Sequence, residues 1–218
     1  KGEYKGSGKQ FDFTFSSALV RWEKLNFKNI NVKAKHETDS FNLNARVGTF
    51  AVGKQLVDSV LLEANLVDDS LWFATKGIFR DSIDSYFRLK GHAFDVGNEA
   101  EPEYTLYLSD GRFNIGTSYF DLIPNNFIHF KKGEVELQNV GFFDHKSAIV
   151  VHGYKSNDPN KILRVNAENL DAELLNYLIR YKALNFKGRM SGDVVVNYES
   201  NIPRFASNLG IDSLFINN

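Results

Sequence analysis

Apolar and polar residues alternate along almost the whole chain, in segments of about one strand length that are separated by short polar turns. This period of two places apolar side chains on one face of an extended strand and polar side chains on the other. The alternating segments are 11–15, 25–33, 41–50, 59–66, 71–79, 85–92, 104–108, 113–115, 127–130, 133–140, 148–154, 162–169, 186–198 and 205–216. Their regular spacing predicts a mainly β fold built as an antiparallel meander. The 19 Phe and 9 Tyr, against 4 Pro and 1 Met, also favour half-buried strands.

Turn residues mark the breaks between these segments. Asp, Asn and Gly tolerate the backbone angles of tight turns, and they cluster at 67–70, 110–111, 132–133, 156–159 and 200–203. Segment 98–103, with three acidic residues and a proline, is expected to be a long exposed loop. Segment 56–64 fits both the helical and the strand period, and we interpret it as a strand because it leads into the turn at 68–69.

One segment has a helical period instead. Asn169 or Asp171 is a suitable N-cap, and the apolar side chains that follow recur on one helical face. These side chains are Leu174, Leu175, Leu178 and Tyr181. The pattern predicts one short amphipathic helix near 171–181, which would pack its apolar face on the sheet or on an open end of it.

Charge, cysteine content and apolar run length exclude several classes of protein. With 26 basic and 27 acidic residues the net charge is -1, so the chain lacks the positive field that gathers phosphates, and we expect no nucleic-acid partner. The absence of cysteine excludes disulfides and thiolate chemistry. The longest apolar runs, 148–151 and 194–196, are far too short for a transmembrane segment. The alternation is still running at the last residues, so we expect 1–218 to be a single β-rich fragment of a longer protein.

Three sets of residues resemble catalytic or binding motifs, and each has an ordinary structural interpretation. Gly48 and the segment 53–55 have the spacing of a phosphate-binding loop, but Gln55 lacks the hydroxyl that would bind magnesium. Glu134 and Glu136 would lie on one face of a strand, about 7 Å apart, as paired acids do in sugar hydrolysis. The same spacing suits a strand with one face in water, and that interpretation is favoured.

The histidines are scattered over different predicted elements. Asp144, His145 and His152 are near enough in sequence to form a metal-ligand set across a hairpin, but their spacing matches no common metal site. No Gly-x-Ser-x-Gly motif supports a serine hydrolase. We therefore expect no catalytic residues, no metal site and no cofactor, and we expect that the protein is not an enzyme.

Two longer stretches resemble the TamB (translocation and assembly module) family within the AsmA-like superfamily. The first is 184–196, Leu-Asn-Phe-Lys-Gly-Arg-Met-Ser-Gly-Asp-Val-Val-Val, followed by 203–205 and 210–214. This stretch is similar to a sequence motif that recurs in that family: a short helix, a strand with two glycines four residues apart, a turn and a return strand. The second runs through 109–113, 124–130, 133–140 and 149–153. Residues 104–218 are the part most similar to the family.

This resemblance implies a β-taco, a long sheet curled into an open trough with an apolar interior; the alternative is a closed β-sandwich. It also implies a periplasmic protein of Gram-negative bacteria, anchored in the inner membrane outside this fragment, that takes part in outer-membrane biogenesis. Members carry phospholipid between membranes, or assist outer-membrane protein assembly and secretion, with an outer-membrane β-barrel as possible partner.

An open trough would offer its apolar face to phospholipid acyl chains. Strand parity gives the candidate lipid-groove residues Val135, Leu137, Ile149, Val151, Val194, Val196, Leu209 and Ile211. The alternative function, for a closed sandwich, is an adhesive or glycan-binding module.

Overall fold

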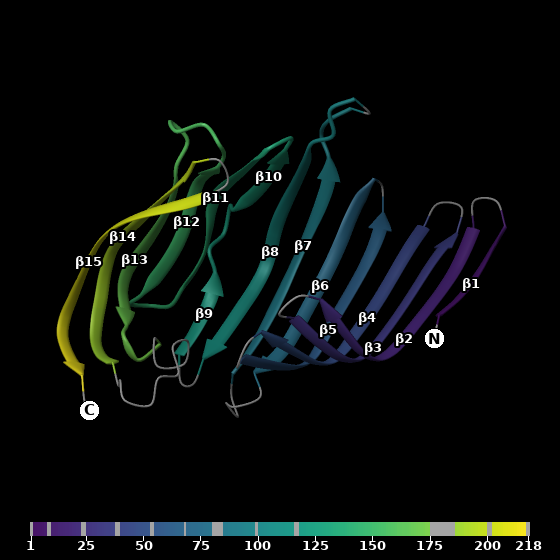
Figure 1. The fold of residues 1–218 in the computed structure, drawn as a ribbon, viewed down its shortest axis with the longest axis horizontal. Helices are drawn as coiled ribbons and strands as arrows, with labels where there is room; N and C mark the ends of the chain where they lie inside the picture. The colour runs from purple at the N-terminus through teal and green to yellow at the C-terminus, as the bar shows by residue number, and fades with distance from the viewer. Residues whose placement is uncertain are drawn as a thin grey trace. The chain divides into compact units, whose positions relative to one another are not determined.

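The computed structural model describes residues 2–7, 10–22, 25–37, 40–52, 55–67, 69–79, 85–98, 100–115, 118–174, 186–199 and 202–216. These residues form 15 strands of one antiparallel meander sheet, which confirms the mainly β prediction (Figure 1). Their bounds are β1 Gly2–Ser7, β2 Gln10–Trp22, β3 Leu25–Glu37, β4 Ser40–Val52, β5 Gln55–Val67, β6 Ser70–Phe79, β7 Tyr86–Asp95, β8 Tyr104–Ile115, β9 Ser118–Leu122, β10 Phe127–Lys131, β11 Glu134–Phe143, β12 Ala148–Lys155, β13 Leu163–Asp171, β14 Phe186–Glu199 and β15 Ile202–Ile216.

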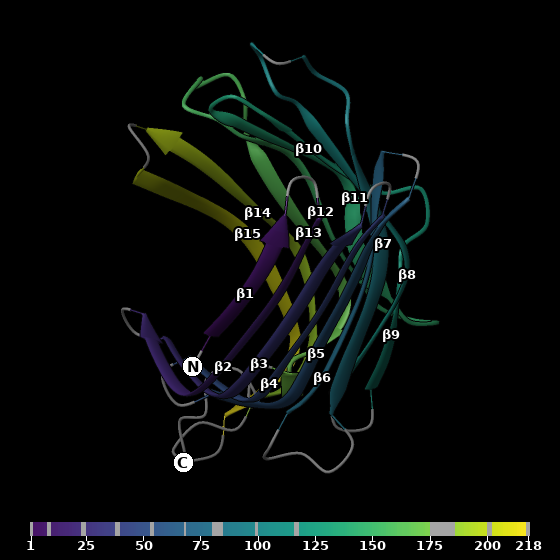
Figure 2. The same cartoon turned by 90° about the vertical axis from the view of Figure 1, so that its right-hand side faces the viewer.

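The chain divides into two compact units. Unit 1 is Lys1–Asp95 with Leu108–Thr117, and unit 2 is Val96–Tyr107 with Ser118–Asn218. Strand β8 therefore contributes its second half to unit 1 and its first half to unit 2. In unit 1 the strands follow the order of the sequence from β1 to β8, and Figure 2 shows β2 to β6 lying side by side. In unit 2 the order is β8, β10, β11, β12, β13, β14, β15, with β9 paired to β11.

The strands of unit 1 have one apolar and one polar face. Antiparallel partners carry their side chains on the same face, so the register identifies the members of each. The apolar face includes Phe13, Phe15, Val32, Ala34, Leu43, Ala45, Leu62, Ala64, Leu66, Leu71, Phe73 and Leu89. The polar face includes Asp12, Lys33, Lys35, Asn42, Asn44, Glu63, Asn65 and Lys90.

In four strands of unit 1, the apolar positions change from odd to even residue numbers, and the change occurs at one row of paired residues across these strands. In β3 the apolar positions are 25 and 27 before Asn29, and 30, 32 and 34 after it. Asn29 and Ser59 both have positive φ in this row, at 53° each. Between them lies Gly48, where a Cβ would come 2.9 Å from the Cβ of Asn29. Glycine allows this close approach, and the row keeps the apolar face continuous despite the change of parity.

In unit 2, β-bulges keep the apolar side chains on one face of the sheet. The register of β11 with β12 shifts between Leu137 and Val140, where Asn139 has a φ of 50°. The register of β13 with β14 shifts between Ala167 and Leu170, where Asn169 has a φ of 49°. Each bulge adds one residue to its strand, so the apolar residues on both sides of it stay on the same face.

Two of the predicted turns are confirmed, and one is wrong. Turns lie between strands at 132–133 and 156–159, and the described residues of 98–103 lie in the connection of β7 to β8. The turns predicted at 67–70 and 200–203 include residues 68, 200 and 201, which lie outside the described residues. The turn predicted at 110–111 does not exist, because β8 runs without a break through Asp110 and Gly111. Asp110 has a strand partner in Arg88, whose Nη2 lies 3.7 Å from its Oδ1, and Gly111 is buried. Segment 56–64 is part of β5, as predicted.

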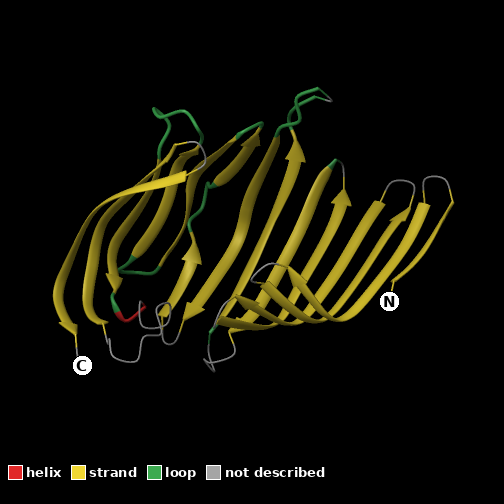
Figure 3. Cartoon of the chain, viewed as in Figure 1, coloured by secondary structure: helices red, strands yellow, loops and turns green. Residues whose placement is uncertain are grey.

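The short helix predicted near 171–181 is not seen. Strand β13 extends to Asp171, and only Glu173 and Leu174 are helical in the part of this segment that the structure describes (Figure 3). The amide of Glu173 donates to Oδ1 of Asp171 at 2.9 Å, which is the contact that an N-cap makes. Residues 175–185, which hold the rest of the predicted stripe, lie outside the described residues.

Within the described ranges, no helix has the length and apolar character needed to cross a membrane.

Candidate functional site

The candidate lipid-groove residues all lie on one face of unit 2. Strand pairing links them in rows, because Val151 is opposite Val165 and Val165 is opposite Val194. The other candidates join the same face through the pairs Leu137–Gly153, Phe142–Ile149, Leu163–Val196, Gly192–Leu209 and Met190–Ile211, and Val135 follows by strand parity. The structure thus brings together every residue that strand parity selected.

We call this surface the apolar face of unit 2. Besides the candidates it carries Tyr104, Leu106, Ile128, Phe130, Val140, Phe142, Leu163, Val165, Ala167, Leu170, Met190 and Phe205. Many of these side chains are accessible: Ile149 is 36% exposed, Ile211 39% and Leu209 42%. Val196 and Leu170, each 6% exposed, are buried members of this face. A large exposed apolar surface of this kind is typical of a binding site.

The opposite face of unit 2 is polar, and several of its charges are paired. Lys161 Nζ donates to Oε2 and Oε1 of Glu134 at 2.6 and 2.8 Å, and the buried Ser156 hydroxyl donates to Oε1 at 2.9 Å. These hydrogen bonds, that of Lys161 first, hold the pKa of Glu134 below its ordinary value. Glu136 accepts a hydrogen bond from Tyr154 and thereby raises the pKa of this phenol.

The two carboxylates of the glycosidase hypothesis are therefore engaged with neighbouring side chains. Glu134 and Glu136 do share a face, but Glu134 fixes the loop at 156–161 through Ser156 and Lys161. Their partners explain both carboxylates without a sugar substrate.

Sequence reasoning missed a second polar cluster, at β8 and β10. His129 Nδ1 lies 2.9 Å from the hydroxyl of Thr105, and its Nε2 lies 3.3 Å from Oε2 of Glu103. Lys131 Nζ is 2.6 Å from Oε1 of Glu103, and this hydrogen bond lowers the pKa of Glu103. The register of β8 with β10 brings these residues together, and the sequence spacing alone does not show it. Thr105 is only 7% exposed, so the hydroxyl is poorly placed to attack a substrate.

The other sequence motifs have structural roles or lie apart. Gly48 is inside β4, and residues 53–54 of the phosphate-loop motif lie outside the described residues. Oδ1 of Asp144 accepts hydrogen bonds from the amides of Lys146 and Ser147, at 2.7 and 2.6 Å, and so closes the loop before β12. Within the described part of the chain, no three His, Asp or Glu side chains gather as metal ligands.

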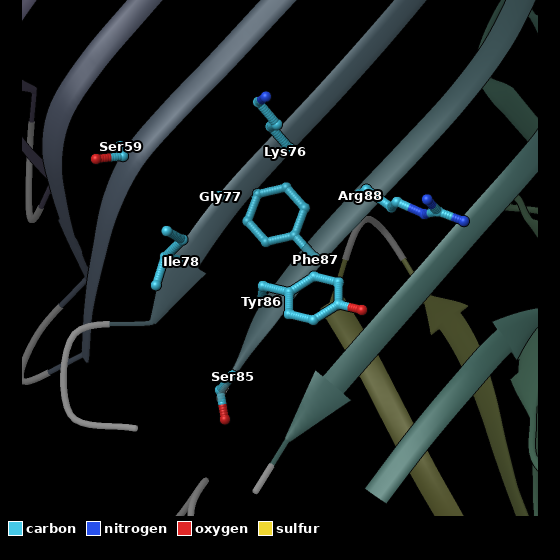
Figure 4. Close-up of a pocket in the computed structure, with 8 residues that line it drawn as sticks. All are labelled: Ser59, Lys76, Gly77, Ile78, Ser85, Tyr86, Phe87 and Arg88. Carbon is cyan, nitrogen blue, oxygen red and sulfur yellow. The ribbon is translucent and has the colours of Figure 1, made fainter. Parts of the chain in front are cut away.

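A cavity of about 420 Å³ lies in unit 1, at the ends of β6 and β7 (Figure 4). Its lining is Ser59, Lys76, Gly77, Ile78, Ser85, Tyr86, Phe87 and Arg88. The ring of Phe87 lies beside Gly77, where a Cβ would come 2.5 Å from it. The cations of Lys76 and Arg88 point away from each other, so they do not converge on one ligand (Figure 4).

None of the three comparisons made with this chain, against protein-family models, curated proteins and solved structures, returns a match.

Proposed function

We propose that this chain is a non-enzymatic, lipid-binding segment whose apolar face holds phospholipid acyl chains. The main support for this proposal is the apolar face of unit 2. The eight candidate positions lie together on it across β11, β12, β14 and β15, and several of their side chains are exposed. Acyl chains make no directional contacts, so a continuous apolar strip is the main requirement for binding them. The paired charges of the polar face leave that face suited to water.

The exposure of the apolar face favours an open trough over a closed sandwich. A sealed sandwich core interdigitates its inner side chains at native density and leaves few of them accessible. Here Ile149, Leu209 and Ile211 are each at least 36% exposed on the face that would form such a core. An open sheet that presents this face to lipid accounts for the same side chains.

The proposed setting is that of TamB and AsmA-like proteins. By this hypothesis the chain lies in the periplasm, as part of a protein anchored in the inner membrane. It would carry phospholipid towards the outer membrane or assist outer-membrane protein assembly and secretion. The support is the motif resemblance in 104–218, together with an apolar face that runs across the strands of unit 2.

The first experiment detects bound lipid directly. Native mass spectrometry of protein purified from bacterial membranes without detergent should show adducts with phospholipid masses. The same sample is screened against soluble glycans. Specific glycan binding without lipid adducts would reject this proposal in favour of an adhesive module.

The second experiment places the lipid on the face. Ile149 and Val150 are adjacent in β12 but lie on opposite faces, since Ile149 pairs with Phe142 and Val150 with Gly141. Ile149→Asp keeps the new carboxylate in reach of water because the site is 36% exposed, so the fold should survive. Val196, at 6% exposure, is unsuitable because a buried unpaired charge costs several kcal/mol.

The expected result is a loss of crosslinking to a photoreactive phospholipid in Ile149→Asp and not in Val150→Asp. Thermal melts of both variants test whether they remain folded. A folded Ile149→Asp protein with unchanged crosslinking would contradict lipid binding at this strand.

A further inference from the structure

One charge stands on the apolar face of unit 2. Lys155 ends β12 and pairs with Val135, so it shares a face with Val151 and Ile149. The alternation Ile149, Val151, Gly153, Lys155 is interrupted by this last residue. Among the strand residues that the structure describes in unit 2, Lys155 is the only Asp, Glu, Lys or Arg that the register places on this face.

The ammonium of Lys155 is held by an aromatic ring. Its Nζ lies 5.8 Å from the ring centroid of Tyr198, within the range of a cation–π contact. Within the described residues no carboxylate pairs with it, in contrast to Lys161, which is bonded to Glu134, and Lys131, which is bonded to Glu103. An ammonium group without a carboxylate partner at the end of an apolar strip is complementary in charge to an anion on that strip.

The row that contains Lys155 has the composition of a membrane interface. Tyr104 pairs with Phe130, Phe130 with Val135, and Val135 with Lys155. Tyr104 is 49% exposed and Phe130 is 40% exposed. Tyrosine and lysine with apolar stems and polar tips favour the boundary between hydrocarbon and water.

At the opposite end of the apolar face, the paired residues of β11 to β15 that the structure describes next to Ile149 and Ile211 are apolar. Its rows contain Phe142 opposite Ile149, Ile149 opposite Ala167, and Met190 opposite Ile211. From Lys155 to Ile149 the strand advances six residues, which at the usual rise is about 20 Å. One leaflet of a bilayer has a hydrocarbon thickness of about 15 Å, so the strip is long enough for an acyl chain laid along the strands.

We infer that Lys155, positioned by the ring of Tyr198, binds the phosphate of a phospholipid whose acyl chains run along the apolar face towards Ile149. This inference rests on the proposed function and adds to it a headgroup position and a direction. The phosphate would lie at the Lys155 row, and the chain ends would lie near Ile149, Met190 and Ile211.

The test compares two lipids that differ only in the headgroup. Native mass spectrometry measures binding of dimyristoylphosphatidylglycerol and of dimyristoylglycerol, which lacks the phosphate. The native protein should prefer the phosphate-bearing lipid by about fivefold, as expected for one lysine at an anionic lipid headgroup. Lys155→Gln should abolish this preference and still bind both lipids. Lys146→Gln, in an exposed loop between β11 and β12, is the matched control and should keep the preference.

A second readout reports direction. A phosphatidylglycerol with a diazirine at the chain end should crosslink near Ile149 and Ile211, and one with the diazirine beside the ester should crosslink near Val135. The reverse order would overturn the inference, as would equal binding of both lipids to the native protein. Glycerophosphate that competes as strongly as the whole lipid would also overturn the inference, because the Lys155 site would then bind a soluble phosphate compound and not a lipid headgroup. Binding of neither lipid would reject the proposed function itself.

Discussion

At the scale of single residues, several glycines of unit 2 lie where neighbouring backbones leave no space for a side chain. A Cβ at Gly141 would come 2.1 Å from the carbonyl oxygen of Ile149. At Gly210, on the same polar face, the nearest atom would be 3.8 Å away. Sequence patterning identifies both as glycines in strands and does not distinguish them, because the difference comes from how closely the partner strand packs.

Gly141→Ala should therefore destabilise the protein, whereas Gly210→Ala should not. The backbone carbonyl of Ile149 cannot move away without disturbing the pairing of β11 with β12, so we expect a loss of about 1–3 kcal/mol. Urea unfolding followed by circular dichroism measures both variants. Equal stabilities would show that the close approach at Gly141 relaxes without cost.

The ion pair of Glu134 with Lys161 should make the stability of the folded protein depend on pH in the acidic range. The folded-state pKa of Glu134 lies below the ordinary value of 4.5, so its contribution is fully present above that value. It is lost as the pH falls through the lower, folded-state pKa. Glu134→Gln removes the titrating group, and the melting temperature of the native protein should converge on that of the variant between neutral pH and strong acid.

Glu63→Gln in unit 1 serves as the control for this titration, because Glu63 is exposed on the polar face of β5. At neutral pH this substitution should change the melting temperature less than Glu134→Gln does, because substitutions of exposed side chains usually change stability little. A Glu134→Gln protein with the same acid profile as the native protein would contradict the role of the pair.

At the scale of elements, alternation predicted most strands because each has one face in water. It did not predict β9, whose five residues are too short to show a period. It also placed a turn at 110–111 from the Asp-Gly pair, although Asp110 contacts Arg88 and the strand continues. The bulges were missed too, since an inserted residue looks like an end of the pattern until the partner strand shows that pairing resumes.

The bulge at Asn139 should depend on the positive φ of this residue. A β-branched side chain is strained there, so Asn139→Val is expected to cost roughly 1–2 kcal/mol. Asn139→Gly should be nearly neutral, because glycine adopts positive φ readily. Gln138→Val, one residue earlier in β11 with negative φ, is the matched control and should not destabilise the fold. Equilibrium unfolding in urea compares the three variants, and equal losses in Asn139→Val and Gln138→Val would contradict this account.

The sequence indicates the residues of the apolar face of unit 2 more readily than the charged residue at the end of that face. The groove candidates that strand parity selected share one face, because the bulges in β11 and β13 preserve the side-chain direction on either side. Lys155 lies just beyond the predicted segment 148–154 and is not among the candidates, although it continues the series of Ile149 and Val151. Its contact with Tyr198 joins residues more than forty positions apart, and only the folded sheet brings them within 5.8 Å.

At the scale of the whole molecule, the division into two units passes through a strand rather than a linker. Leu108–Thr117 belongs to unit 1 and Val96–Tyr107 to unit 2, so β8 is shared. No composition change marks this point, because the sequence on both sides alternates in the same way. A boundary inside a strand has no signal of its own in the sequence, and a single fragment remains the natural interpretation of the pattern.

This boundary predicts which fragments of unit 1 will fold. Residues 1–117 contain the whole unit, whereas 1–95 lack the second half of β8 and its contacts. Phe113 packs edge-on against Phe79, with ring centroids 5.6 Å apart, and Phe79 also contacts Phe87 at 6.0 Å. Without Phe113 this cluster loses a large apolar partner, and β7 becomes an exposed edge that is open to aggregation.

The fragment 1–117 should therefore unfold cooperatively in urea, and 1–95 should be less stable and should aggregate more readily. Phe113→Ala in the longer fragment separates the two causes, because it removes the ring and keeps the strand. We expect it to cost about 3–5 kcal/mol if the cluster is well packed, without producing aggregates. Analytical ultracentrifugation with urea unfolding measures all three. If 1–95 were as stable and as monomeric as 1–117, the second half of β8 would not be part of unit 1.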